Sequence, residues 1–445
     1  MLQKLIDAFA KKAKRAGINR LEFYIKERQG QTVQVYQQEV ERISLSDETL
    51  VFIEGEYEGY KGSTFVESID TANISEHLDV IRQIAQDNKE PFRPRRVVAI
   101  HPNSQRMPQE LPPVDKVTEW LSKAEQKAYG YDRRIDNVSN CSHTALREKI
   151  ILLDDQGERL QDTIQFNEIR MSLVARDRTA IQSAFENQLG KSLGKRELFS
   201  LADQAAEKVI SQLVASPVKT GQYAVILQNS LVCDLVLAFL PGVYADRVQK
   251  KMSVLTDKLG QAITSSLFSL IEDPKLPQGI ITRHFDDEGI PTQRKTIIEN
   301  GRLKTFLHNL ETAHAFKMQS TGNGFKNLYR ESPAISATNL YIPGGTLTTT
   351  EMMKEMKCGL LITDCDGIFA GANPVSGDFS LIAKGYLVED GAIQRAVNQI
   401  TIGGNYYDML NQLSIIGSEY ASGGSVRGFI QAPSLLINQL FVSGI

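Results

Sequence analysis

Apolar side chains recur at helical spacing in several segments of the chain. The first segment, near residues 2–15, places Ile6 and Phe9 on one face and several lysines on the other. This amphipathic pattern predicts a helix, and the strand-like sequence that follows at once favours packing on its own domain over lying on a membrane. The same spacing predicts further helices at residues 74–86, 114–129 and 197–214.

Between these helices, runs of β-branched and aromatic residues alternate with polar ones, as is typical of half-buried strands. Glu389–Gly391 between two such runs has the composition of a hairpin turn. Predicted strands of the first half lie near residues 21–26, 32–36, 49–53, 63–66, 139–153, 166–176 and 178–186. Those of the second half lie near residues 223–227, 359–363, 379–388, 392–397 and 434–437.

The chain of 445 residues is too long for one ordinary hydrophobic core. Six prolines within residues 88–113 predict a long connection without regular structure, and residues 216–221 break the last helix of the first half. We therefore predict an α+β fold with two domains. Residues 1–214 form an N-terminal α/β domain, and residues 221–445 form a mostly antiparallel β domain with a few helices.

Composition narrows the class of protein. Apolar residues make up 42% of the chain and charged residues 23%, with 50 basic residues against 53 acidic ones. There is no basic stripe to support direct nucleic-acid binding, no signal peptide, and no apolar run of the roughly 18 residues that a transmembrane helix needs. The longest apolar run, Ser230 to Leu240, contains Asp234. A cytoplasmic protein whose four cysteines are reduced is expected.

Common catalytic motifs are absent from the sequence, including the P-loop, GxGxxG, GxSxG and HExxH. His308, Glu311 and His314 would share a broad face of a helix and could hold a metal ion, although surface helix positions are the simpler interpretation. The acidic run Asp286–Glu288 and the pair Asp364 and Asp366 are interpreted as turns rather than cation sites. We accordingly predict no catalytic residue and no metal ligand in this chain.

Six blocks of the second half resemble, in the same order, motifs of the TldD/PmbA peptidase family. The resemblance is clear from about residue 220 to 445, and the blocks together are specific where each alone would not be. The blocks are FDDEGIPTQR (285–294), IENGRLK (298–304), QSTGNG (319–324), GANPVSGDFS (371–380), KGYLVEDG (384–391) and NQITIGGN (398–405).

The resemblance implies a division of labour between two kinds of subunit. Members of the TldD type carry HExxxH in a helix early in the C-terminal domain, and a later cysteine completes the zinc site. The corresponding helix here is residues 231–240, which have neither histidine nor glutamate, and the late segment 423–428 has no cysteine. The resemblance therefore places the chain with the PmbA type. It implies zinc in a TldD-like partner and an extended peptide as substrate.

Three functions remain open. The first is the PmbA-like subunit of such a metallopeptidase, as a heterodimer with the TldD-like protein or as a homodimer, in which glycine-rich turns line a peptide cleft. The second is a hydrolase in its own right, with a metal site built from His284, His308, Glu311 or Asp286. The third is a protein-binding regulator of the gyrase-modulator type. The candidate substrate-binding residues, for which structural turns are the simpler alternative, are Thr321, Gly322, Asn323, Gly324, Asn373, Pro374, Ser376, Gly377 and Asp378.

Overall fold

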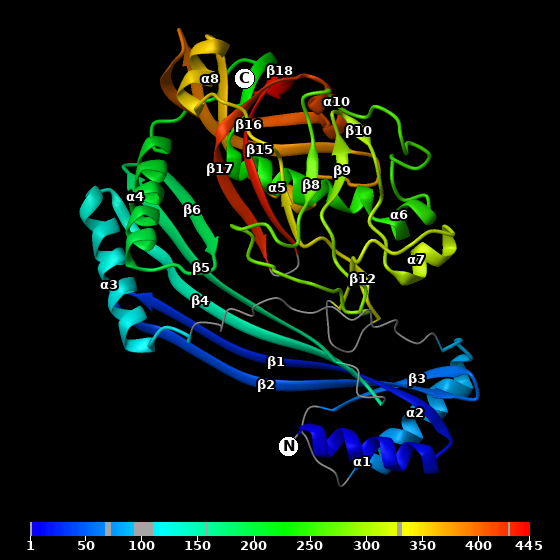
Figure 1. Cartoon of the computed structure of the whole chain (residues 1–445). Coiled ribbons are helices and arrows are strands. Elements are labelled where there is room, and N and C mark those ends of the chain that lie inside the picture. The colour runs from blue at the N-terminus through cyan, green and yellow to red at the C-terminus, as the bar shows by residue number, and fades with distance from the viewer. Residues whose placement is uncertain (1, 67–72, 93–109, 156–158, 327–331, 426–427) are drawn as a thin grey trace.

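The N-terminal half builds one antiparallel sheet of six strands. The computed structural model describes residues 2–66, 73–92, 110–155, 159–326, 332–425 and 428–445. The strand order is β3-β2-β1-β4-β5-β6, and the sheet forms a long twisted band beside the C-terminal half (Figure 1). Its strands are β1 (Ile18–Tyr36), β2 (Glu39–Tyr57), β3 (Tyr60–Val66), β4 (Ile135–Asp154), β5 (Arg159–Asp177) and β6 (Ala180–Gly190).

Two separate helix pairs cover opposite ends of this sheet. Helices α1 (Leu2–Arg15) and α2 (Ile74–Asn88) pack on one end, and α3 (Val114–Tyr131) and α4 (Lys195–Gln212) pack on the other. In α1, Ile6, Phe9 and Ala13 are buried in the first of these cores, so the apolar face of this helix packs on its own domain as expected. Much of the proline-rich connection lies outside the described residues.

The long strands bridge the two cores. The sequence predicted separate strands at residues 21–26 and 32–36, but β1 runs unbroken from Ile18 to Tyr36. Its middle, Glu27–Gly30, is polar and is not fully buried because it crosses the space between the two helix pairs. Pairing with β2 and β4 holds this polar stretch extended, which the hydrophobic pattern could not indicate.

The C-terminal half contains a sheet of ten strands, five of which close into a ring. Successive pairings run β7-β14-β15-β16-β18 and return from β18 to β7. The pairings are mostly antiparallel, with parallel pairs β7–β14 and β13–β18, and together with the first sheet they confirm the predicted α+β class. The strands are β7 (Gly221–Leu227), β8 (Leu270–Glu272), β9 (Lys295–Glu299), β10 (Arg302–Leu303), β13 (Asn339–Tyr341), β14 (Gly359–Asp366), β15 (Asp378–Glu389), β16 (Ala392–Asn405), β17 (Leu413–Ser425) and β18 (Gly428–Ser443).

Helix α5 (Asn229–Phe239) lies in the core of this half, against β14, β17 and β18. Its last residue, Phe239, stacks on Tyr406 with ring centroids 4.3 Å apart. No helix in the described ranges is both long enough and apolar enough to cross a membrane. The remaining short elements are a 3-10 turn (Leu240–Val243), α6 (Ala245–Gln249), α7 (Leu310–Ala315), α8 (Thr349–Met356), α9 (Ile368–Gly371), α10 (Tyr406–Asn411), β11 (Gly324–Phe325) and β12 (Ala334–Ile335).

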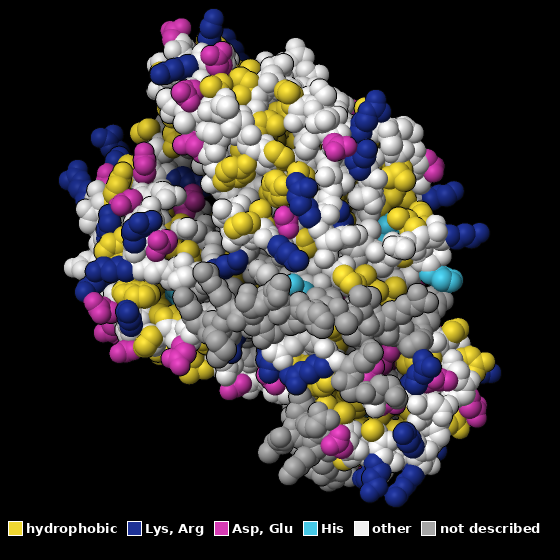
Figure 2. Space-filling view, in the orientation of Figure 1, with side chains coloured by type: hydrophobic (Ala, Val, Ile, Leu, Met, Phe, Trp, Pro, Cys, Tyr) yellow, Lys and Arg dark blue, Asp and Glu magenta, His cyan; other side chains and the backbone are white. Residues whose placement is uncertain are grey.

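The face of the first sheet that the helices leave uncovered packs against the C-terminal half. Ile280, Ile281, Phe285 and Phe429 bury themselves among side chains of β1, β2, β4 and β5. On the outer surface, basic and acidic side chains are interspersed over the face seen in Figure 2. The contact between the halves is therefore an apolar core formed by the first sheet, the segment 280–285 and β18, and it helps to fix how the halves face each other.

Replacing Gly62 with alanine should destabilise the N-terminal sheet. A Cβ at Gly62 would lie 1.7 Å from the carbonyl oxygen of Ile81, so α2 must move away from β3. Overpacking of this kind costs about 1–3 kcal/mol, and thermal unfolding followed by circular dichroism measures it. Gly130→Ala is the control, because nothing lies within 4 Å of a Cβ at this position in α3. Equal melting temperatures for the two variants would contradict the packing described.

Candidate functional site

A cleft of about 770 Å³ lies where the two halves meet. The N-terminal half contributes Glu186–Leu189 of β6 and two side chains of α4. The C-terminal half contributes one face of α5, Phe369 of α9 and Tyr420–Ser425 of β17. The ends of β6 and β17 approach each other across this cleft (Figure 1).

Both strands present backbone to the cleft. β6 is the last strand of its sheet, and its one pairing among the described residues is with β5. β17 pairs with β18 along Tyr420–Ser425, and within the described ranges its other edge is bridged only earlier, at Gly417. Unpaired strand edges are the feature that an extended peptide recognises by main-chain hydrogen bonding.

Helix α5 lines the cleft with Ser230, Asp234 and Leu237, spaced four and three residues apart and thus on one face of the helix. The late segment of the sequence reaches the same place, since a Cβ at Gly423 would lie 2.8 Å from the Cβ of Cys233. The tertiary fold therefore brings together the helix and the late segment in which the resemblance puts zinc ligands.

The side chains present on α5 do not fit a zinc ion. A structural or catalytic zinc site needs three or four imidazole, thiolate or carboxylate ligands, and this helix face offers one carboxylate. Cys233 is buried in the core with its Sγ 3.6 Å from the carbonyl oxygen of Ala421, and burial raises the pKa of its thiol to about 12. Across the described residues, no group of three or more His, Cys, Asp or Glu side chains is arranged to hold a metal ion.

Charged side chains from both halves meet beside one wall of the cleft, which Glu186 and Asp234 line. The Nζ of Lys208 in α4 lies 2.8 Å from Oε1 of Glu186 in β6 and 3.3 Å from Oδ2 of Asp364 in β14. Burial disfavours the charged form of Lys208, but the two carboxylates raise its pKa above the ordinary value. Asp234 lies beside this group, and burial, reinforced by Asp364, raises its pKa to about 6.

Two regions of the chain match sequence profiles of known domains. Residues 108–213 match the PmbA/TldA metallopeptidase central domain, and residues 220–444 match the PmbA/TldA metallopeptidase C-terminal domain. The chain belongs to the TldD/PmbA family. The central-domain match covers α3, α4 and β4 to β6, and the C-terminal match covers the whole second sheet.

Relatives of this chain are named as PmbA metalloproteases, in agreement with the family assignment. The chain is 30% identical to a metalloprotease PmbA homologue of Haemophilus influenzae, over 74% of this chain and 70% of that protein. It is 27% identical to metalloprotease PmbA of Escherichia coli O157:H7, over 76% and 71% of the two chains.

Solved structures share the whole fold. A Thermotoga maritima protein proposed to modulate a DNA gyrase aligns over 100% of both chains, with a TM-score of 0.87 and 28% identity. TldE of Thermococcus kodakarensis aligns over 99% of this chain and 100% of its own length with a TM-score of 0.86, and its 21% identity shows the fold alone.

The family block at residues 285–294 builds the junction between the halves. Asp286 accepts backbone N–H bonds from Glu288, Ile290 and Gly324, at 3.0, 2.9 and 2.9 Å. Glu288 accepts one from the N–H of Leu310, at 2.7 Å. These acidic side chains, interpreted from the sequence as a turn, shape this loop and hold the segments beside it.

Buried charges at the junction join the two halves directly. Arg283 Nη2 lies 2.7 Å from Oδ1 of Asp287, and Arg283 Nε lies 3.5 Å from Oδ2 of Asp162 in β5. Asp162 also accepts from the backbone N–H of His284 at 2.7 Å. Its other oxygen lies 2.6 Å from Nδ1 of His284, and this side-chain hydrogen bond raises the pKa of the imidazole. Tyr24 of β1 donates to Asp287 at 3.3 Å. We call these residues the junction network: Tyr24, Asp162, Arg283, His284 and Asp287.

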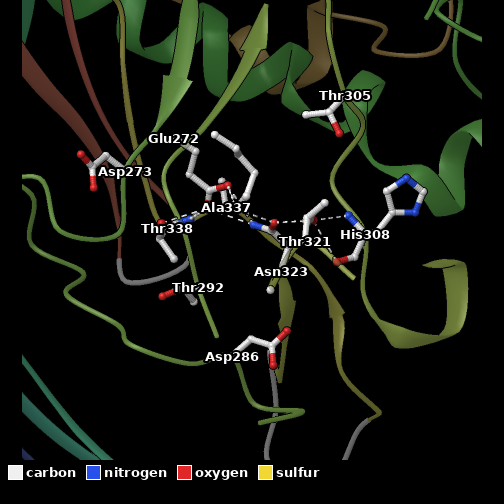
Figure 3. Close-up of polar contacts among 12 residues, drawn as sticks. Glu272, Asp273, Asp286, Thr292, Thr305, His308, Thr321, Asn323, Ala337 and Thr338 are labelled. Atoms are coloured by element: carbon white, nitrogen blue, oxygen red, sulfur yellow. Dashed lines mark hydrogen bonds and ion pairs between the residues drawn. The ribbon is translucent and has the colours of Figure 1, made fainter. Parts of the chain in front are cut away.

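The first predicted substrate-binding turn, Thr321–Gly324, lies in a buried network rather than at the cleft. Asn323 Nδ2 donates to Oε1 of Glu272 at 3.0 Å, and Lys295 Nζ lies 2.8 Å from the other oxygen of that carboxylate. The hydroxyl of Thr321 donates to Asn323 Oδ1 at 2.7 Å. Figure 3 shows Glu272, Thr321 and Asn323 pointing toward one another. These contacts give the turn a structural role, and substrate contact there stays a prediction.

The second predicted turn contains Asn373, Pro374, Ser376, Gly377 and Asp378 and is closed by its own hydrogen bonds. Gly377 takes a positive φ of 86° and donates to the carbonyl of Asn373 at 2.8 Å. The side-chain amide of Asn405 donates to the carbonyl of Ser376 at 2.9 Å and to Asp378 at 3.0 Å. Two family blocks distant in sequence thus hold each other, and none of these five residues lines the cleft.

The stretch from His308 to His314 does not form the helix face proposed for a metal. His308 precedes α7, which is only six residues long, and Asn309 caps it by accepting from the N–H of Thr312 at 3.0 Å. The ring of His308 is directed away from Glu272 and Asn323 (Figure 3), and burial lowers its pKa to about 4.

Sequence reasoning missed the charged wall of the cleft. Glu186, Lys208 and Asp234 belong to different elements and share no motif, so their meeting depends on how the halves pack. One signal was present in the sequence, because Asp234 is the one charged residue in the longest apolar run. A carboxylate in such a run must face either water or a partner.

Replacing Arg283 with methionine should strongly destabilise the protein. The change removes the guanidinium from the buried Asp287 and leaves His284 as the cationic partner of Asp162. Breaking a buried ion pair in this way typically costs about 3–5 kcal/mol. Thermal unfolding measures it. The control is Arg294→Met, which removes an arginine with 57% side-chain exposure and a 3.8 Å ion pair and should have little effect. Similar melting temperatures for the two variants would show that the junction network does not hold the halves together.

Replacing Glu288 with glutamine should stabilise the protein more at high pH than at low pH. Burial raises the pKa of both Asp286 and Glu288. The three backbone N–H donors of Asp286 stabilise its ionised form, so Glu288 is the residue that keeps its proton to higher pH. Because the pKa of Glu288 is raised in the folded state, its side chain contributes stability below pH 4.5, the ordinary pKa of glutamate. This contribution is lost as the pH rises through the folded-state pKa.

The gain from Glu288→Gln is expected to be on the order of 1 kcal/mol at about pH 8 and smaller at about pH 5. Denaturant unfolding at both pH values measures it, with Glu355→Gln on the exposed side of α8 as control. A gain of the same size at both pH values would rule out the protonated glutamate.

Proposed function

We propose that this chain is the metal-free subunit of a two-component peptidase of the TldD/PmbA type. In this proposal it holds an extended peptide in the cleft between β6 and β17, and a zinc-bearing partner of the TldD type cleaves the peptide. The observation that carries the proposal is the cleft itself. Among the described residues, no further strand pairs with β6 or with the Tyr420–Gly424 stretch of β17 along the cleft. The cleft face of α5 bears Ser230, Asp234 and Leu237 instead of a zinc ligand set.

Peptide binding needs no catalytic side chain at such a site. An extended chain laid along β6 or β17 would form main-chain hydrogen bonds with the strand, and the space of about 770 Å³ would receive its side chains. The names of the relatives support a peptidase-related role, since those of Haemophilus influenzae and Escherichia coli O157:H7 are metalloproteases. A relative named TldD homologue in Buchnera aphidicola, 23% identical to this chain, supports the idea of a TldD-type partner.

The two other functions have less support in the geometry. For a hydrolase acting alone, His284 is engaged with Asp162 and His308 is buried before a short helix. For a regulator of gyrase, the argument is the name of the Thermotoga maritima relative. The net charge of −3 favours contact with protein over contact with DNA.

Reconstitution with a partner tests the proposal. We expect no cleavage of an unstructured peptide by this chain alone, and cleavage that is at least about tenfold faster when both chains are present than with the TldD-type protein of the same organism alone. Mass spectrometry reports the products, and a chelator should abolish them. Chelator-sensitive cleavage by this chain alone would refute the metal-free assignment, and no gain over the partner alone would refute the two-component one.

A cleft-blocking variant refines this test. Ser422 lines the cleft, so Ser422→Trp should remove the gain in rate, whereas Ser380→Trp on the exposed face of β15 should retain it. If Ser422→Trp retained the gain in rate as fully as Ser380→Trp, the peptide would bind elsewhere.

A further inference from the structure

The wall of the cleft carries more negative charge than the chain itself neutralises. Among the described residues, the ammonium group in contact there is Lys208, which pairs with both Glu186 and Asp364 and also lowers the pKa of Asp234. Asp234 is the third carboxylate, and no hydrogen bond or ion pair to its side chain is found within the described residues. Three carboxylates therefore share a single cation at the edge of a partly enclosed space.

An ionised carboxylate in such a place favours a cation. Asp234 projects from the middle of α5 into the cleft, and like-charge repulsion from Asp364 adds to the cost of its burial. A positive group entering the cleft would remove both penalties at once. Lys208 offsets part of this cost, since it lowers the pKa of Asp234, but its direct ion pairs are with Glu186 and Asp364. A cation paired directly with Asp234 would therefore come from a molecule bound in the cleft.

The surroundings of Asp234 also suit a long aliphatic stem. Leu237 lies on the same face of α5, and the cleft is bordered by Phe369 and Tyr420, which are 75% and 47% exposed. Exposed aromatic rings and a carboxylate that line the same cleft suit the apolar stem and the cationic head of a lysine or arginine side chain. The stem packs on apolar surface, and the cationic head pairs with the carboxylate or lies over a ring.

We propose that the cleft selects extended peptides that carry a lysine or arginine, with the cationic head paired to Asp234 and the stem against Leu237, Phe369 and Tyr420. This inference rests on the proposed function, because it takes a peptide as the occupant of the cleft. It adds a preference for basic side chains, and this preference requires no catalytic group in this chain. Asp234 is the residue that determines it.

Peptide binding to the full-length chain alone tests the inference. Two fluorescent peptides of about six residues, the length of an ordinary strand, are compared by anisotropy at about pH 7.5. One has a central lysine and the other has norleucine, which keeps the stem and lacks the charge. We expect the lysine peptide to bind roughly tenfold more tightly, as one charge-assisted hydrogen bond allows.

Variants then assign the preference to one residue. Asp234→Asn should remove the lysine preference and leave norleucine binding unchanged. Asp87→Asn, at an exposed position of α2 remote from the cleft lining, should keep the preference. The melting temperature of each variant shows that it is folded, and the comparison of the two peptides on the unmodified chain does not depend on any variant.

The outcomes separate the two proposals. If both peptides bind equally to the unmodified chain, or if the preference survives in Asp234→Asn, the basic specificity is refuted and the peptide cleft stands. If neither peptide binds at concentrations that saturate the reconstituted enzyme, the assignment of the cleft to peptide is itself refuted. A lysine preference lost only in Asp234→Asn supports the inference.

Discussion

The buried ion pairs of Arg283 with Asp162 and Asp287 are the contacts on which the arrangement of the molecule depends. Each partner is almost fully buried, and buried charges are tolerated only where opposite charges and hydrogen bonds meet them in one geometry. The guanidinium comes from the C-terminal half and Asp162 from β5 of the first sheet. Their pairing therefore specifies one orientation of the halves, which the apolar contacts of Phe285 and Phe429 reinforce.

That orientation creates the cleft. β6 belongs to one half and α5 and β17 to the other, so none of them encloses a space by itself. Lys208 of α4 crosses the gap to Asp364 and makes a second polar link between the halves. Strand edges and a carboxylate brought together in this way can bind and orient a peptide.

The blocks that identify the family encode the framework rather than the chemistry. Asp286 and Glu288 organise a loop, Asn323 satisfies the buried Glu272, and the turn containing Gly377 is held by Asn405. Buried polar networks of this kind tolerate few substitutions, because removing one member leaves another unsatisfied. Such motifs can therefore be retained whether or not a chain is catalytic, since the fold needs them.

The sequence by itself determined the elements and the family. The helices at residues 74–86 and 114–129 and the hairpin at Glu389–Gly391 follow from periodicity and turn composition, which are local properties. It did not determine that β1 is continuous through Glu27–Gly30, because pairing with two neighbours overrides the polar composition of that stretch. Nor could it assign Thr321–Gly324 to a buried network or bring Glu186, Lys208 and Asp234 to one wall. Those outcomes depend on contacts between residues far apart in the chain, and only tertiary packing decides which distant charges must share a low-dielectric space.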